Sequence, residues 1–386
     1  MHAAVSLDEG RGALAIIDQT LLPLREELIY LKSPEDIRDA IYELKVRGAP
    51  AIGAAAAIGA YLAADAVAKK ITADAVAGNI AVDAVAGNIP ADAVAKKIPE
   101  KALSTPAFES FLMQFRAAID LLNSARPTAV NLSWALKRME RVAVKYKNEP
   151  LAAVVSRLKD ECLAILDEDA RVCEAIGKHG LELLTPGMGL LTHCNAGRLA
   201  TASQYGTATA PIYLGHERGY GFKVYCGETR PLLQGARLTA YELCSSGVDA
   251  TLFCDNMTSS LMSAGLIDAV LVGCDRVAAN GDTANKIGTS YIAIAAKHYE
   301  IPFYVCAPSP TVDLACDSGE SIVIEQRQAK EVTDMWYANR VAPDGIKVFN
   351  PSFDVTDAGL ISAIITENGI ARPPYKESLA ALIPRT

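Results

Sequence analysis

The sequence predicts an α/β protein: a mainly helical N-terminal domain with a few short strands, and a C-terminal domain built on a Rossmann-like parallel sheet. Helical periodicity dominates residues 33–179, whereas short apolar runs alternate with helical segments from Gly189 onward. The 386 residues of the chain suffice for two domains with separate cores. We therefore predict domains at residues 1–178 and 179–386.

The N-terminal domain is predicted to begin with two strands, at Ala13–Ile17 and Glu27–Tyr30, followed by helices. Ser33-Pro34-Glu35-Asp36 marks a helix start, because serine caps a helix, proline fits its first position and acidic side chains suit its first turn. We predict that this helix ends at Val46. The remaining helices of this domain are predicted at residues 51–61, 108–122, 130–146 and 151–179.

Residues 64–99 form a low-complexity insert of four nine-residue units: ADAVAKKIT, ADAVAGNIA, VDAVAGNIP and ADAVAKKIP. Nine residues make two and a half helical turns, so successive units of one continuous helix would face opposite sides and present no single apolar stripe. Gly78-Asn79 and Gly87-Asn88 also favour breaks. We therefore expect short helical turns or disorder at the surface, without a catalytic role.

The C-terminal domain alternates apolar runs with helical segments. Strands are predicted at residues 190–193, 223–225, 250–253, 269–272 and 303–305, and helices at 197–202, 237–245, 258–264 and 287–298. This alternation predicts parallel strands whose functional loops lie at one edge of the sheet. The sequence has no GxGxxG fingerprint, so it does not indicate a dinucleotide cofactor.

Composition narrows the classes of function. The net charge of −8, without a dense run of Lys and Arg, argues against a nucleic-acid partner. The N-terminus does not resemble a signal peptide and no stretch has eighteen uninterrupted apolar residues, so we expect no membrane association and a cytoplasmic protein, with a nuclear pool as the alternative. Nine cysteines without a CxxC pair, and only five histidines, predict buried thiols in a reducing compartment and no metal site.

The most informative stretch of the sequence is Gly273–Gly288, GCDRVAANGDTANKIG. It follows the apolar run at residues 269–272, so its polar side chains are expected where a buried strand ends. Asp275 is a candidate proton donor or acceptor, and Asn285 and Lys286, which precede a helical run, are candidates to bind an anionic group. The alternative is a polar loop with a capping aspartate.

A second candidate is Cys194, in the sequence THCNAG at residues 192–197. A cysteine before a helix can be kept partly ionised by the helix N-terminus and act as a base or nucleophile; the alternative is a buried structural thiol. Cys194 and Asp275 both end predicted strands, so we expect them at the same edge of the sheet. For His193 we predict a structural role.

Three further loops carry groups that hold anions. Glu228–Pro231 and Gln234–Arg237 together supply two arginines and an amide, although arginine pairs with carboxylates as readily as with phosphate. Arg47–Pro50 places an arginine beside backbone N–H groups at a helix start. The stretch Asp255–Thr258 is consistent with a simple N-cap box.

Six separated motifs closely resemble the methylthioribose-1-phosphate isomerase family. They are RGAPAIG at 47–53, SARPTAVNL at 124–132, THCNAG at 192–197, ETRPLLQGARLTAYEL at 228–243, GCDRVAANGDTANKIGT at 273–289 and NPSFDVT at 350–356. This family belongs to methionine salvage and is related to regulatory subunits of the translation-initiation guanine-nucleotide exchange factor. The resemblance covers nearly everything except the insert and the termini.

The resemblance implies an aldose–ketose isomerase that converts 5-methylthioribose 1-phosphate to 5-methylthioribulose 1-phosphate without a metal or other cofactor, and a homodimer formed through the C-terminal domains. It implies catalytic roles for Cys194 and for Asp275 as proton donor. The implied substrate contacts are Arg47, Gly48, Ala49, Arg126, Gln234, Asn285 and Lys286. The sequence departs from the family pattern at Arg198, Cys274 and Asp357, of which Arg198 bears on the shape and charge beside Cys194.

Two other functions stay open at this point. A non-catalytic regulatory subunit of the exchange factor would share the fold but would have no reason to retain a Cys/Asp pair. A ribose-1,5-bisphosphate isomerase would need extra basic residues at the distal end of the sugar. Two routes also stay open for the isomerisation: Cys194 removes a proton from C2, or it shapes an apolar site in which a hydride shifts from C2 to C1.

Overall fold

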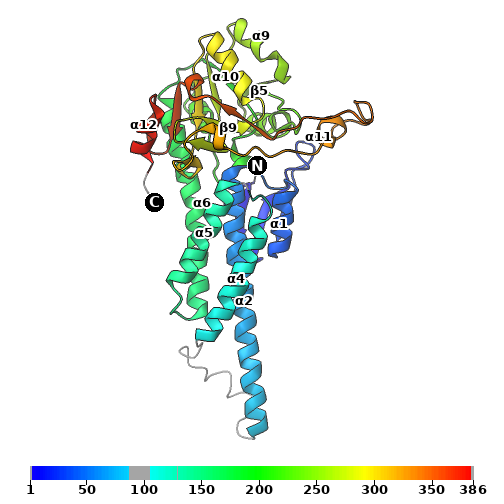
Figure 1. Ribbon diagram of the computed structural model, residues 1–386, viewed down its shortest axis with the longest axis vertical. Coiled ribbons are helices and arrows are strands. Elements are labelled where there is room, and N and C mark those ends of the chain that lie inside the picture. The colour runs from blue at the N-terminus through cyan, green and yellow to red at the C-terminus, as the bar shows by residue number, and fades with distance from the viewer. Residues whose placement is uncertain (1, 87–104, 128, 384–386) are drawn as a thin grey trace.

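The computed structural model describes residues 2–86, 105–127 and 129–383. A helical N-terminal part carries a C-terminal part built on a mostly parallel sheet (Figure 1), so the predicted α/β class is confirmed. The first sheet is antiparallel, in the order β1 (Val5–Asp8), β2 (Ala13–Ile17) and β3 (Leu28–Leu31). Strand β2 is fully buried and matches its prediction, β3 begins one residue later than predicted, and β1 was not predicted.

Helix α1 (Pro34–Tyr42) begins where predicted, because the Ser33 hydroxyl accepts a hydrogen bond from the Asp36 N–H at 3.1 Å. It ends before the predicted Val46. Leu44 adopts the left-handed conformation, with φ of 62°, which stops the helix and turns the chain toward Arg47.

Helix α2 runs without a break from Ala49 to Ala86, so the predicted stop at residue 61 and the predicted break at Gly78-Asn79 are wrong. The repeats are rich in alanine, the strongest helix former, and one glycine costs only about 1 kcal/mol in a helix. The part of the insert from Gly87 to residue 99 lies outside the described residues. Helices α4 (Thr105–Asn123), α5 (Val130–Lys145) and α6 (Leu151–Leu181) pack against α2.

Part of α2, Ala49–Ala75, is by length and composition apolar enough to cross a membrane, with a mean hydropathy of 1.6, and no other helix among the described residues meets that test. In the most apolar 18-residue stretch of this segment, 78% is buried inside the protein. Small side chains permit this packing: a Cβ at Gly53 would lie 3.0 Å from the Asn131 carbonyl oxygen of α5. The helix therefore has the burial of a core helix.

The large sheet has seven strands in the order β14-β13-β10-β7-β4-β5-β6, all parallel except β14. The five predicted strands are present, and β13 and β14 were not predicted. Their bounds are β4 Gly189–Thr192, β5 Lys223–Gly227, β6 Asp249–Phe253, β7 Ala269–Val272, β10 Phe303–Cys306, β13 Ala363–Thr366 and β14 Gly369–Ala371. The chain starts in the middle at β4, goes first to one side and returns to β7 on the other. A crevice is expected where that order reverses, beyond the carboxyl ends of β4 and β7.

The C-terminal helices are α7 (Ala210–Glu217), α8 (Ala240–Ser245), α9 (Thr258–Ser263), α10 (Thr289–His298), α11 (Lys330–Thr333) and α12 (Tyr375–Leu382). The predicted helix at 197–202 is wrong, because only a 3-10 turn forms, at Arg198–Ala200. The Thr201 hydroxyl exchanges hydrogen bonds with the backbone of Ser203, which competes with helix formation. The predicted helix at 237–245 is a π-type turn, Gly235–Thr239, followed by α8.

The stretch after β7 is a β-hairpin and not the polar loop that the sequence left open as the alternative. Strands β8 (Arg276–Ala278) and β9 (Thr283–Lys286) pair antiparallel and form a four-stranded sheet with β11 (Val312–Asp313) and β12 (Phe353–Thr356), in the order β11-β8-β9-β12. This small sheet covers the carboxyl end of β7 and carries Asn285 and Lys286 back toward β4.

Candidate active site

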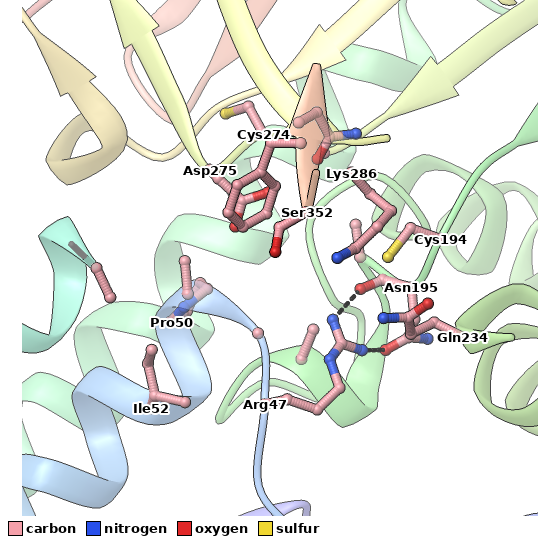
Figure 2. Close-up of a pocket in the computed structure, with 18 of the residues that line it drawn as sticks. Arg47, Pro50, Ile52, Cys194, Asn195, Gln234, Cys274, Asp275, Lys286 and Ser352 are labelled. Carbon is pink, nitrogen blue, oxygen red and sulfur yellow. Dashed lines mark hydrogen bonds between the residues drawn. The ribbon is translucent and has the colours of Figure 1, made fainter. Parts of the chain in front are cut away.

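One pocket is lined by all nine residues that the sequence analysis proposed for the site. It lies beyond the carboxyl ends of β4 and β7, between the hairpin and the first turn of α2 (Figure 2). The nine are Arg47, Gly48, Ala49, Arg126, Cys194, Gln234, Asp275, Asn285 and Lys286. Their chemical roles remain predictions, which the geometry below makes specific.

Cys194 lies two residues after the end of β4 and has a strained backbone, with φ of 61°. Two threonines hold this conformation: the Cys194 N–H donates to the Thr229 hydroxyl at 2.9 Å, and the Thr239 hydroxyl donates to the Cys194 carbonyl at 2.6 Å. The side chain is 8% exposed and lines the pocket. No helix of useful length begins here, so the predicted activation of the thiol by a helix N-terminus is wrong.

Asn195 connects Cys194 to Arg47. The Arg47 guanidinium donates to the Asn195 side-chain oxygen at 2.5 Å and to the Asn195 backbone carbonyl at 2.6 Å (Figure 2). The Asn195 amide nitrogen in turn donates to the Thr239 hydroxyl at 3.1 Å and to the Glu242 carboxylate. The sequence carried no signal for this connection, because the partners are 44 to 148 positions apart.

Asp275 lies in the bend directly before β8, and its N–H donates to the Ala284 carbonyl of β9 at 2.9 Å. Burial raises the pKa of Asp275, although the charges of Lys286, Arg126 and Arg47 oppose the shift. Burial also lowers the pKa of Lys286, although electrostatic interactions with Cys194 and Asp275 act to raise it. Asp275 can therefore keep a proton at a pH where an exposed aspartic acid has lost it, as a proton donor requires.

The positive charges of the pocket differ in their partners. Arg126 pairs with Glu325 at 3.0 Å, and Arg327 pairs with Glu325 and with Glu331 at 3.1 and 2.5 Å. Arg47 and Lys286 have no carboxylate within salt-bridge distance among the described residues. These two are thus the cations most available to an anionic ligand. Glu325 and Arg327 were not singled out from the sequence.

The first turn of α2 adds backbone donors to these cations. Gly48 has a φ of 96°, and a Cβ there would lie 2.5 Å from the Cα of Ala200, so only glycine fits between the two segments. The close approach brings the N-terminus of α2, where N–H groups point outward and favour anions, into the wall of the pocket.

Two amides complete the polar wall. Gln234 is 6% exposed, and its side-chain oxygen has no hydrogen-bond partner among the described residues. The Asn285 amide nitrogen donates to the Thr289 hydroxyl at 3.0 Å, which fixes the orientation of that side chain. A buried acceptor without a partner is costly, so the Gln234 oxygen is suited to a ligand hydroxyl.

Three loop predictions need correction. Arg237 donates to the backbone carbonyls of Gln19, Thr20 and Leu22. Arg230 donates to the Val332 carbonyl at 2.8 Å, so neither arginine is in the pocket. Asp255 does not cap a helix, because its carboxylate accepts from the N–H groups of Thr229 and Arg230.

His193 and Arg198 contact partners other than Cys194 and Asp275. His193 also lines the pocket, where its Nε2–H donates to the Ile287 carbonyl at 2.9 Å and burial lowers its pKa; its structural role stays a prediction. The Arg198 guanidinium lies 4.0 Å from the centre of the Tyr213 ring and donates to Ser246, away from the pocket. Within the described ranges, no three His, Cys, Asp or Glu side chains are grouped to hold a metal.

Comparison with known proteins places this geometry in a family. The model of the initiation factor 2 subunit family matches residues 91–373, most of the chain. The chain belongs to the initiation factor 2 subunit family. Within this family it is 56% identical to a methylthioribose-1-phosphate isomerase of Symbiobacterium thermophilum, with 99% of this chain and 96% of the relative covered. The relationship therefore extends over the whole length of the two proteins.

Two further relatives in this family widen the comparison. The chain is 52% identical to a 5-deoxyribose 1-phosphate isomerase of Petrotoga mobilis, with 98% of both proteins covered. Among solved structures, it resembles the 5-methylthioribose 1-phosphate isomerase of Pyrococcus horikoshii at a TM-score of 0.82 and 36% identity, with 99% of this chain and 96% of that chain covered.

Proposed function

We propose that the protein is an aldose–ketose isomerase that converts 5-methylthioribose 1-phosphate to 5-methylthioribulose 1-phosphate in methionine salvage. The observation that carries this proposal is the convergence of Cys194 and Asp275, with seven predicted substrate contacts, in one pocket. The names of the 56% identical relative and of the Pyrococcus structure support the choice of substrate.

The charges of the pocket support a substrate with one phosphate. Arg47 and Lys286 lack a carboxylate partner among the described residues, whereas Glu325 and Glu331 offset Arg126 and Arg327. A bisphosphate would need a second set of unpaired cations, which disfavours ribose 1,5-bisphosphate. The remaining wall includes Leu44, Ile52, Val130, Leu232 and Phe353, and such side chains suit an apolar group at C5 of the sugar.

The chemistry must move a hydrogen from C2 to C1, although the phosphate on O1 prevents ring opening to a free aldehyde. In the proposed mechanism Asp275 protonates the ring oxygen as its bond to C1 breaks, and C2 is oxidised to the ketone as C1 is reduced. In one route Cys194 takes the C2 proton as a base, and the resulting enol becomes the ketone when O2 loses its proton to a base and C1 takes up a proton that has exchanged with solvent. In the other route hydride moves directly from C2 to C1 and the O2 proton leaves to a base.

A second candidate substrate is 5-deoxyribose 1-phosphate, which differs from the first only at C5. The 52% identical Petrotoga relative carries this name. Both substrates need the same phosphate site, acid and base, so the pocket supports the same reaction on either. Only the fit of the apolar C5 group distinguishes them.

Turnover of three sugar phosphates tests these alternatives. We expect kcat/KM to be highest for 5-methylthioribose 1-phosphate, lower for 5-deoxyribose 1-phosphate and lowest for ribose 1,5-bisphosphate. The reverse order would replace the proposed substrate, and no turnover of any would favour a non-catalytic subunit. Deuterium at C2 then separates the routes: retention at C1 supports hydride transfer, and loss to solvent supports Cys194 as the base.

We also propose that the chain acts as a homodimer in the cytoplasm. Large apolar side chains between residues 335 and 349 are exposed, including Trp336, Tyr337, Val341 and Phe349, which supports association. Nine cysteines without a disulfide support a reducing compartment. Light scattering of the purified protein tests the dimer, since a monomeric mass at micromolar concentration contradicts it.

A further inference from the structure

Glu242 lies behind Asn195 and is not among the residues that line the pocket. It belongs to α8 and is completely buried. One carboxylate oxygen accepts from the Asn195 amide nitrogen, and the other accepts from the Arg198 N–H at 2.6 Å. A fully buried carboxylate is expensive unless it is paired, so its position requires an explanation.

The contacts of Glu242 determine which way the Asn195 amide faces. The single proton of the Thr239 hydroxyl is used by the Cys194 carbonyl, so Thr239 can only accept from Asn195. Glu242 also accepts. The Asn195 nitrogen must therefore face these two acceptors, and its oxygen must face the Arg47 guanidinium. If the amide turned over, it would present N–H groups to Arg47.

We propose that Glu242 is a positioning residue that, through Asn195, holds Arg47 in the orientation that binds the substrate phosphate. Arg47 then keeps both contacts to Asn195, and its remaining N–H groups stay directed into the pocket. Gly197 makes room for this arrangement, because a Cβ there would lie 2.0 Å from a Glu242 oxygen. The proposal rests on the proposed function.

The charge state of Glu242 gives the proposal a measurable signature. Burial raises the pKa of Glu242 to about 7, although hydrogen bonds from Asn195 and Arg198 and the charges of Arg47 and Arg198 oppose the shift. Tyr213 of α7 also faces the carboxylate. The ionised form accepts both hydrogen bonds, so the support of Arg47 is complete only well above pH 7 and is lost as pH falls through about 7.

The test compares wild type with Glu242→Gln, which keeps the shape but has only one acceptor. At pH 8 we expect KM for 5-methylthioribose 1-phosphate to rise about tenfold, with kcat within threefold. The KM ratio of E242Q to wild type should approach one near pH 6, where wild-type Glu242 is protonated. The titration of the substrate phosphate cancels in this ratio.

A double-mutant cycle with Asn195→Ala shows whether Glu242 acts through Asn195. E242Q should add little to the KM of N195A. Asp169→Asn is the matched control, because burial also raises the pKa of Asp169 to about 7 while its carboxylate holds the Ala202 N–H and touches neither Asn195 nor Arg47. The KM ratio of D169N to wild type should not vary with pH.

The proposal is overturned if E242Q has a KM within twofold of wild type at pH 8, if its KM ratio is constant from pH 6 to 8.5, or if the two substitutions are additive. Should E242Q not fold, the KM ratio of N195A to wild type must show the same decrease toward pH 6. A wild-type enzyme that does not turn over the substrate refutes the proposed function instead, so the two failures are distinguishable.

Discussion

The two sides of the pocket are held in place by different kinds of interaction. The Cys194 side is an irregular loop whose backbone is fixed by side chains, mainly Thr229, Thr239 and Glu242. The Asp275 side is a hairpin fixed by regular backbone pairing, from β8 and β9 to β12. The loop therefore depends on the identity of a few buried polar residues, whereas the hairpin tolerates changes in side chains that preserve its strands.

The largest effects should come from the two reacting side chains, one on each side. We expect Cys194→Ser and Asp275→Asn each to lower kcat by at least about a thousandfold, because each removes a group that moves a proton or shapes its transfer. Circular dichroism and thermal unfolding should show both variants folded. Activity within tenfold of wild type in either variant would refute its assignment.

The next largest effect should come from Gly197→Ala, on the Cys194 side of the pocket. Its Cβ would lie 2.0 Å from the Glu242 carboxylate, so the carboxylate must move. We expect the free energy of unfolding to fall by about 2 kcal/mol and kcat/KM to fall roughly a hundredfold.

Gly187→Ala is the matched control for this substitution. Gly187 has a φ of 85°, and a Cβ added there would meet no other atom within 4 Å, so alanine should cost only left-handed strain, about 1–2 kcal/mol, with activity unchanged. Equal losses of activity in G197A and G187A would contradict the dependence of the loop on Glu242.

Thr229→Val and Thr283→Val compare one threonine from each side. The first leaves the buried Cys194 N–H without its acceptor, so we expect about 1–3 kcal/mol of destabilisation and a roughly tenfold lower kcat. Thr283, on β9, donates only to the Gly281 carbonyl, and its loss should cost about 1 kcal/mol and leave kcat intact. Chemical denaturation and steady-state kinetics measure both, and the reverse ranking of kcat would refute the comparison.

The hairpin side should control the alkaline limb of the pH profile. Burial raises the pKa of Asp275, so its proton-donating form survives to higher pH than in an exposed aspartic acid, and kcat should fall as pH rises through that pKa. Asp282, on the same hairpin, provides a control because hydrogen bonds from Asn280, Gly319 and Ala358 lower its pKa despite burial. Asp282→Asn should leave the limb in place, and a kcat that shows no alkaline fall contradicts the assignment.

Arg198→Ala should have the smallest effect. The substitution removes the contact with the Tyr213 ring and the hydrogen bond to Ser246. It keeps the backbone N–H that donates a hydrogen bond to the Glu242 carboxylate. We expect about 1 kcal/mol of destabilisation and kcat/KM within threefold of wild type. A tenfold loss would show that the guanidinium itself shapes the Cys194 loop.

The sequence was sufficient to predict the strands of the large sheet that supply the site. Buried parallel strands are short apolar runs, and the positions after them, such as Cys194 after β4 and Asp275 after β7, meet at one edge. The prediction of Arg126 needed the family resemblance, because no local pattern marks it. The fold class and the set of pocket residues were thus accessible before the structure.

Other features depend on contacts between distant segments and left no local trace. Glu242 looks like an ordinary acidic residue of a helix until Asn195, 47 positions away, is placed beside it. Arg237 was a candidate to bind either an anion or a nearby carboxylate, yet it donates to the backbone carbonyls of residues 19, 20 and 22. The continuity of α2 does not follow from its glycines, because the helix-forming alanines that surround them outweigh their cost.

Helix α2 places the nine-residue repeats far from the pocket that its first turn helps to form. Its first turn forms part of the pocket, while its 38 residues span about 57 Å, so its far end projects well away from the sheet (Figure 1). Each nine-residue unit adds about 13.5 Å and two and a half turns to a helix. Duplication or deletion of a unit therefore changes the reach of the helix and leaves the reacting groups where they are, which makes this end a natural place for evolution, or for a tethered label, to vary the protein.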